Sequence, residues 1–299
     1  MSETFTTVAG RRLKLTNLDK VMYPSTGFTK ADVIDYYTRV APVLLPHLRN
    51  RPLTLKRYPD GVEGEVFYQK QAPKHRPDWV RTVRIPTRDR DIDFVVVTGL
   101  PTLVWLANLA DLELHTSLAR ATSVDRPTAL VFDLDPGAPA TVVECCRVAL
   151  LIRRIGEAMG VEFWPKTSGS KGLQLYAPLN GRAGFDRTRD FAHAVAARLE
   201  QEHPELIVTT VKREVRDGRV LIDWSQNALM RTTVNVYSLR ARERPTVSTP
   251  ITWREVERAA REGDPGMLVF DWQQALERID RHGDLFRPVL DVRQRLPRP

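Results

Sequence analysis

Apolar residues along the chain follow two periods, one typical of strands and the other of helices. Short apolar runs alternate with longer stretches in which apolar residues recur every three or four positions. Because strands and helices alternate, we expect an α/β chain. The pattern predicts strands at 11–15, 53–57, 65–70, 130–134, 162–165, 173–178, 207–213 and 219–223, and helices at about 140–159 and 188–201.

A further long helix is predicted to begin after Thr29. Asp32 follows three residues later, so the pair resembles a capping box with a shorter acid. Pro42 and Pro46 are expected to interrupt the later turns of this helix, because proline lacks the amide hydrogen that an inner turn needs.

An uncharged run at 94–110 raises the question of a membrane-spanning segment. It is slightly shorter than a spanning helix, and Thr-Gly-Leu-Pro at 98–101 is a turn signal inside it. We therefore interpret the run as a buried strand followed by a core helix that ends near Ala121. The C-terminal part is predicted to be helical, because 252–255 forms a capping box and 271–274 a near match.

The composition is that of a globular protein with an excess of positive charge. The 299 residues include 45 Lys and Arg against 37 Asp and Glu, which gives a formal net charge of +8. This charge favours a nucleic-acid partner only slightly over an ordinary basic surface. Cys145 and Cys146 are adjacent, too close for an ordinary disulfide and too few for a zinc cluster. Since the N-terminus has no signal pattern, we expect a soluble cytoplasmic protein.

Two carboxylates end one of the predicted strands. Asp133 and Asp135 are two residues apart, so both side chains project from the same face of the strand. Two like charges side by side repel unless a cation neutralises them, and hard oxygen ligands suit Mg²⁺ or Mn²⁺. The alternative is a pair of solvated acids that cap the next helix, and the two residues alone do not decide between these interpretations.

A third acid strengthens the metal hypothesis. Asp223 ends another apolar strand, and three acids at the ends of neighbouring strands can hold the two cations used for phosphoryl transfer. A hairpin or helix-capping role for Asp223 stays open at this point.

The loop at 166–172, Lys-Thr-Ser-Gly-Ser-Lys-Gly, lies between two predicted strands. Its glycines, hydroxyls and lysines are groups that bind phosphate through backbone amides and ammonium charge. It is not a Walker A loop, because the spacing differs and a strand follows. Taken alone, it is more typical of a flexible surface turn than of a phosphate site.

Three motifs in order resemble the archaeo-eukaryotic primase superfamily. They are Phe-Asp-Leu-Asp-Pro-Gly at 132–137, Thr-Ser-Gly-Ser-Lys-Gly at 167–172 and Val-Leu-Ile-Asp-Trp-Ser-Gln-Asn at 220–227. The sequence is most similar to the polymerase domain of bacterial ligase D and to its stand-alone actinobacterial primase-polymerase relatives. The resemblance extends from about Leu15 to Leu285. It implies a primase-polymerase fold in which central antiparallel and mixed sheets form a catalytic cleft flanked by helices.

The resemblance also implies roles for individual residues. The metal ligands would be Asp133, Asp135 and Asp223. The positions implied to bind the nucleotide are Lys56, His115, Ser168, Lys171, Gln174, Gln226 and Arg240. Without the resemblance, His115 would be interpreted as a structural histidine at the end of a helix.

The family also binds the 5′-phosphate of a downstream DNA strand. Lys20 and Lys30 match those positions, and a helix N-terminus with two ammonium groups suits a phosphate. Phe67 and Tyr68 match aromatic residues that stack on template bases, which is a sequence-tolerant contact. The alternatives are a solvated lysine pair and two strand aromatics of which one lies in the core.

Gln174 departs from the family pattern, which has histidine at this position. The alternation with Leu173 and Leu175 still directs Gln174 towards the site. Glutamine donates a hydrogen bond but carries no positive charge. We therefore expect weaker triphosphate binding or altered nucleotide choice, with activity retained.

Together these features predict one primase-polymerase catalytic domain over residues 1–299. Its expected parts are a DNA-binding part at about 1–110, a catalytic core at about 111–245 and a helical part at about 246–299. The resemblance implies a monomeric, nucleoid-associated, template-dependent nucleotidyltransferase that uses Mg²⁺ or Mn²⁺ and prefers ribonucleotides.

Its implied substrates are NTPs or dNTPs and DNA gaps or ends with a 5′-phosphate, in base excision repair or non-homologous end joining. A DNA ligase and the Ku end-binding protein would come from other chains. The alternative is a DNA-end bridging protein with little catalytic activity, which Gln174 alone supports.

Overall fold

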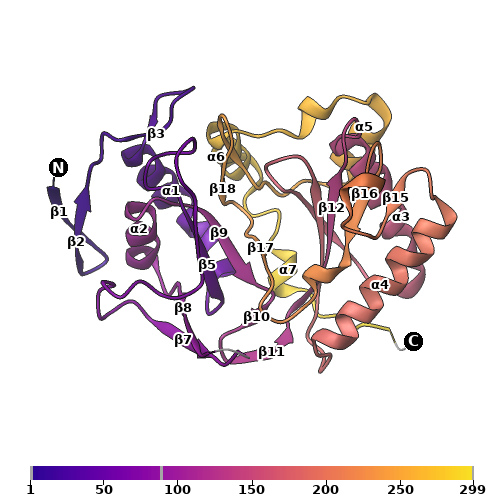
Figure 1. Cartoon of the computed structure of the whole chain (residues 1–299), viewed down its shortest axis with the longest axis horizontal. Helices are drawn as coiled ribbons and strands as arrows, with labels where there is room; N and C mark the ends of the chain where they lie inside the picture. The colour runs from indigo at the N-terminus through magenta and orange to yellow at the C-terminus, as the bar shows by residue number, and fades with distance from the viewer. Residues whose placement is uncertain (1–2, 88–89, 298–299) are drawn as a thin grey trace. The chain divides into compact units, whose positions relative to one another are not determined.

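The computed structural model describes residues 3–87 and 90–297, and the chain divides into two compact units (Figure 1). The expected α/β architecture is confirmed, since both units combine helices with sheets. None of the helices in the described part of the chain is long and apolar enough to cross a membrane. Unit 1 comprises residues 1–117, 232–247 and 271–283, and unit 2 comprises residues 118–231, 248–270 and 284–299.

Unit 2 is built on a five-stranded sheet. Its strand order is β13-β14-β12-β16-β15, and every pair is antiparallel except β15 with β16. The strands of unit 2 are β10 (Ala119–Arg120), β11 (Ser123–Pro127), β12 (Ala129–Pro136), β13 (Trp164–Thr167), β14 (Leu173–Pro178), β15 (Ile207–Val208) and β16 (Val220–Asp223). Its helices are α3 (Val142–Met159), α4 (Phe185–Glu202), α5 (Trp253–Glu262) and α7 (Pro288–Asp291), with 3₁₀ turns η1 (Arg213–Val215), η2 (Trp224–Gln226) and η3 (Pro265–Leu268).

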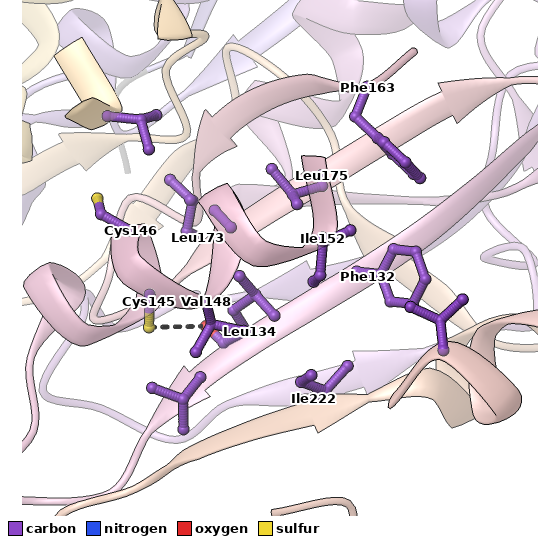
Figure 2. Close-up of a cluster of buried hydrophobic side chains, with 14 of the residues drawn as sticks. Phe132, Leu134, Cys145, Cys146, Val148, Ile152, Phe163, Leu173, Leu175 and Ile222 are labelled. Atoms are coloured by element: carbon purple, nitrogen blue, oxygen red, sulfur yellow. Dashed lines mark hydrogen bonds between the residues drawn. The ribbon is translucent and has the colours of Figure 1, made fainter. Parts of the chain in front are cut away.

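The core of unit 2 lies between this sheet and helices α3 and α4. Phe132 and Leu134 of β12 are fully buried and face Val148 and Ile152 of α3 (Figure 2). The Cys145 thiol lies 3.5 Å from the carbonyl oxygen of Leu134, and both cysteines are buried and free, as expected from their adjacency.

Unit 1 contains a second sheet of six strands. Its order is β17-β9-β5-β8-β7, and β6 also pairs with β5. Its strands are β5 (Pro52–Arg57), β6 (Phe67–Gln69), β7 (Thr82–Ile85), β8 (Ile92–Val96), β9 (Asp111–Ser117) and β17 (Thr232–Val234). Three hairpins pair β1 (Glu3–Val8) with β2 (Arg11–Thr16), β3 (Val21–Tyr23) with β4 (Phe28–Thr29), and β18 (Leu239–Ala241) with β19 (Pro245–Val247). The helices are α1 (Lys30–Leu48), α2 (Leu100–Asn108) and α6 (Trp272–His282).

The expected capping boxes are confirmed, but the expectation that prolines interrupt α1 is wrong. Thr29 caps α1 with Asp32, and Thr252 and Asp271 cap α5 and α6 in the same way. α1 nevertheless runs through Pro42 and Pro46 without a break. Its apolar face is almost completely buried, and this burial offsets the backbone hydrogen bonds that the prolines remove.

Two further boundaries differ from the sequence-based expectation. The helix expected to end near Ala121 ends at Asn108, and Ala110 takes a left-handed φ of 58° before strand β9 begins. β9 alternates polar and apolar residues from Asp111 to His115, but it follows the apolar helix without an intervening Gly or Pro, so the helix was expected to extend through it. The strand expected at 207–213 stops at Val208, because Thr209 bonds to Glu200 of α4 through both its amide and its hydroxyl.

Candidate active site

The three candidate metal ligands lie on neighbouring strands of unit 2. Asp133 and Asp135 are on β12, and Asp223 ends β16 directly opposite Asp133 in the antiparallel register. Residues that pair directly across two strands project from the same face. The pleat therefore directs these acids away from the face on which Phe132 and Leu134 pack into the core.

The electrostatic environment shows how close the carboxylates are. Burial, followed by the charges of Asp135 and Asp223, raises the pKa of Asp133 to about 7, against the opposing effects of Gln174 and Lys166. An acid whose neighbours disfavour its ionised form is a good cation ligand, because a bound cation removes that cost.

Asp223 is held by its own local donors. One carboxylate oxygen accepts from the Ser225 amide at 3.1 Å and its hydroxyl at 2.6 Å, and the other accepts from Gln226 Nε2 at 2.7 Å. Over residues 3–87 and 90–297, no three His, Cys, Asp or Glu side chains converge into a ready coordination site. The donor set nevertheless fits a hard divalent cation, since it consists of carboxylate oxygens that disfavour one another's charge.

The loop after β13 returns tightly towards β12. The Ser168 hydroxyl accepts from the amides of Ser170 at 3.2 Å and Gly172 at 3.0 Å, which closes the turn. A Cβ atom at Gly172 would lie only 2.0 Å from the Leu134 carbonyl oxygen, so this position requires glycine. Lys171 is exposed beside this turn. The loop therefore places a lysine and a hydroxyl at the end of the strand that carries Asp133 and Asp135.

Gln174 points towards the carboxylates, as its strand alternation predicts. Its side chain is 3% exposed, and Nε2 donates to Asp133 Oδ1 at 3.0 Å. Its Oε1 accepts from Lys166 Nζ at 2.6 Å. The structure thus brings Gln174 to Asp133 and Gln226 to Asp223, while the nucleotide-binding roles of Gln174 and Gln226 stay predictions.

In unit 1, three other candidate residues meet at Glu113, which the sequence reasoning missed. Glu113 Oε2 lies 3.1 Å from Lys56 Nζ, 2.9 Å from His115 Nε2 and 3.3 Å from Arg240 Nε. Its Oε1 accepts from the Ala241 amide at 3.1 Å. An acid two residues before His115 in an apolar strand was the available signal, because it places both side chains on the same face.

The charges around Glu113 determine its ionisation. Burial alone would raise its pKa, but the His115 hydrogen bond and the charges of Arg240 and Lys56 hold it far below the usual range. Burial lowers the pKa of His115 in spite of Glu113, so the ring is mainly neutral near pH 7. His115 lies on β9, so its expected place at the end of a helix is wrong.

Lys20 and Lys30 also lie near each other in unit 1. Lys20 Nζ is 2.6 Å from Asp60 Oδ1, while Lys30 Nζ donates to the Thr16 carbonyl oxygen at 2.7 Å. Burial and then the charges of Lys20 and Arg57 lower the pKa of Lys30 to about 8. Lys30 opens α1, so two ammonium groups lie near a helix N-terminus.

Phe67 and Tyr68 are both exposed on β6. Their exposed fractions are 43% and 56%, so neither belongs to the core. The Tyr68 hydroxyl is 3.2 Å from the Thr232 hydroxyl. Successive side chains on a strand point to opposite faces, so each of these exposed rings is available for stacking on its own face of β6.

Comparison with known proteins gives consistent matches over nearly the whole chain. The family model of the LigD primase-polymerase domain matches residues 29–286. The multifunctional non-homologous end joining protein LigD of Mycolicibacterium smegmatis is 40% identical over 280 residues, covering 93% of this chain and 36% of that protein. The bifunctional non-homologous end joining protein LigD of Bacillus subtilis is 33% identical over 273 residues, covering 91% of this chain and 43% of that protein.

A solved structure matches at the level of the fold. The polymerase domain from Mycobacterium tuberculosis ligase D, in complex with DNA, superposes with a TM-score of 0.86 and 38% sequence identity. The match covers 94% of this chain and 98% of that one. The chain spans less than half the length of these curated relatives. The resemblance inferred from the three motifs is thereby confirmed.

Proposed function

The chain belongs to the LigD primase-polymerase domain family and is a nucleotidyltransferase of the primase-polymerase type; on this premise we propose that it extends a 3′-hydroxyl opposite a template at DNA gaps or ends during end joining. The observation that carries the proposal is the set of Asp133, Asp135 and Asp223 on two paired strands. Gap filling in excision repair is a second setting for the same reaction.

The three acids are proposed to hold two divalent cations, Mg²⁺ or Mn²⁺. Such cations, when bound, activate the attacking hydroxyl and neutralise the charge that develops on the triphosphate. The contribution of the protein is to group its carboxylates on one face of the sheet. Gln174, Ser225 and Gln226 orient two of them by direct hydrogen bonds.

Two groups of residues, one within each unit, are proposed to take part in nucleotide binding. In unit 2, Lys171, Ser168, Gln174 and Gln226 would bind the triphosphate and its surroundings. In unit 1, Lys56, His115 and Arg240 are fixed by Glu113 and would present two permanent cations and a neutral imidazole. Ribonucleotide preference belongs to this proposal and follows from family membership.

The DNA is proposed to bind unit 1. Lys20 and Lys30 would hold the 5′-phosphate at the α1 N-terminus, where the helix dipole favours an anion. Phe67 and Tyr68 would stack on template bases. We expect a monomer, located at the nucleoid, that works with a DNA ligase and the Ku end-binding protein.

Extension of a primer across a one-nucleotide gap tests this function. The substrates are gaps with and without the 5′-phosphate, supplied with NTPs or dNTPs and Mn²⁺ or Mg²⁺. We expect templated addition that is faster with the phosphate and with NTPs. Binding without any addition would instead favour the end-bridging alternative, and indifference to the phosphate would remove the roles of Lys20 and Lys30.

A further inference from the structure

Lys166 is a buried cation that the proposed reaction does not use directly. It lies on β13 with an exposed fraction of 0%, and its Nζ donates to Gln174 Oε1 at 2.6 Å and to Ser248 Oγ at 2.7 Å. A buried ammonium group is costly unless its donors are satisfied. The position of this lysine is therefore a specific feature of the sheet.

The strand register arranges Lys166 and the carboxylates in one row. Lys166 pairs with Gln174, Gln174 with Asp133, and Asp133 with Asp223, across β13, β14, β12 and β16. Side chains of directly paired residues project from the same face of a sheet. The row therefore joins a buried ammonium group to two candidate metal ligands through a single amide.

The hydrogen-bonding chemistry of Lys166 favours one orientation of the Gln174 side-chain amide. An ammonium group only donates hydrogen bonds, so Gln174 must present its carbonyl oxygen to Lys166. The NH₂ group of Gln174 is then directed at Asp133, an acceptor, at 3.0 Å. Ser248 faces Lys166 with its lone pairs, because its own hydroxyl donates to the Thr167 carbonyl oxygen at 2.8 Å. With Lys166 removed, Asp133 alone would orient the amide, and the carbonyl end of Gln174 would lose the donor that anchors it in this row.

We propose that Lys166 is a positioning residue for Asp133 and acts through Gln174. By fixing the amide, Lys166 fixes the hydrogen bond on Asp133 Oδ1 and with it the rotation of that carboxylate. In this proposal, the fixed rotation leaves Oδ2 of Asp133 available to bind a cation together with Asp135 and Asp223. The inference rests on the proposed function of the three acids as cation ligands.

This arrangement also explains why glutamine is acceptable at position 174. The position needs one acceptor end for Lys166 and one donor end for Asp133, and both an amide and a neutral imidazole have one of each. Glutamate lacks the donor end and leucine lacks both. Gln174→His is therefore the conservative variant, whereas Gln174→Glu and Gln174→Leu break the row.

The experiment is a double-mutant cycle on Lys166→Met and Gln174→Leu. Mn²⁺ affinity is measured from the electron paramagnetic resonance signal of free Mn²⁺, and kcat and KM for the nucleotide are measured on the one-nucleotide gap. Partners that orient a metal ligand contribute about 10- to 100-fold to affinity or activity. We expect a loss of this size in Mn²⁺ affinity and kcat for each single variant and no further loss in the double variant.

Three further variants make the result specific. Gln174→His should keep Mn²⁺ affinity within about threefold of the wild type, since it preserves the donor and the acceptor. Lys171→Met removes an exposed lysine of the same loop and should raise the nucleotide KM without changing Mn²⁺ affinity. Gln174→Glu replaces the side-chain NH₂ group by an oxygen and so removes the donor to Asp133. It tests the same row of side chains if Lys166→Met does not fold.

The outcomes separate this inference from the proposed function. An active wild type combined with unchanged Mn²⁺ affinity in both Lys166→Met and Gln174→Glu would overturn the role of Lys166 and leave the function intact. Independent losses that add in the double variant would overturn the route through Gln174. A wild type that adds no nucleotide would overturn the proposed function, whatever the variants do.

Discussion

The acidic cluster of unit 2 and the basic cluster of unit 1 are stabilised in opposite ways. In unit 1, one carboxylate, Glu113, touches Lys56, His115 and Arg240 directly. In unit 2, the buried cation Lys166 reaches Asp133 through the Gln174 amide, and burial together with the charges of Asp135 and Asp223 raises the pKa of Asp133. The carboxylate of the basic cluster is therefore held in its ionised form by its neighbours, whereas the ionised form of Asp133 is disfavoured by its neighbours.

The difference in direct ion pairing shows which cluster has its charges balanced before substrates or cations bind. Direct ion pairs fix side chains in advance, so the Glu113 cluster is preorganised for an anion. The carboxylates of unit 2 raise the cost of one another's charge, and in the proposed function divalent cations from solution would neutralise them. The account therefore predicts that the two clusters respond differently to mutation, pH and cations.

The largest effect is expected from removing the central acid of unit 2. Asp133→Ala should lower kcat for gap extension by at least about 10³-fold, because the cations would lose one of their three proposed carboxylate ligands. Single-turnover extension measures this loss. The matched control is Asp186→Ala, which removes an exposed acid of α4 and should leave the rate unchanged. A rate within tenfold of the wild type would contradict the assignment of Asp133.

Removing the shared acid of unit 1 should act on both stability and nucleotide affinity. Glu113→Gln leaves two buried or half-buried cations without a carboxylate, and breaking such a buried pair costs about 2–5 kcal/mol. We expect that loss in the free energy of unfolding and a rise of about tenfold in nucleotide KM, with a smaller change in kcat. Urea denaturation and steady-state kinetics measure the two.

The control for this variant is Glu262→Gln, which breaks an exposed pair with Arg258 on α5. It should leave the denaturation midpoint and KM unchanged. If Glu113→Gln behaved like this control, the preorganisation of the basic cluster by Glu113 would be disproved.

The acidic cluster of unit 2 was predicted from the sequence, whereas the contacts of Glu113 and Lys166 were not, for a physical reason. The acids were found because Asp133 and Asp135 share a face of one strand, a local pattern. Glu113 was missed as the partner of Lys56 and Arg240, because these contacts join distant segments of the chain. The same holds for the contact of Lys166 with Ser248, which is 82 residues away. No local period reports such a tertiary hydrogen bond.

Strand β14 was predicted correctly and strand β9 was not, although both are buried along nearly their whole length. β14 follows Gly172, which marks its start in the sequence. β9 follows the apolar helix α2 with no Gly or Pro between them, so it was interpreted as part of that helix. α1 continues through two prolines because tertiary burial outweighs the local penalty.

A smaller effect is expected from Lys30, whose polar contacts are neutral oxygens of Thr16. Its pKa of about 8 lies below the usual 10.5, so the free protein loses this positive charge as the pH rises through 8. The preference for a 5′-phosphorylated gap should therefore weaken by a fewfold between pH 7 and pH 9. Competition binding of gaps with and without the phosphate measures it, and a preference that is constant to pH 9 would contradict the placement of the phosphate at Lys30.

The most direct test of the comparison is the shift in melting temperature that Mn²⁺ produces at pH 7.5. A ligand at free concentration c that binds only the folded state raises its stability by RT ln(1 + c/Kd), so a tighter ligand gives a larger shift at the same concentration. We predict a clear upward shift for the wild type, an equal shift for Glu113→Gln from a lower starting temperature, and none for Asp133→Asn. The same shift in Asp133→Asn as in the wild type, or no shift in either, would contradict the claim that the acidic cluster is completed by divalent cations.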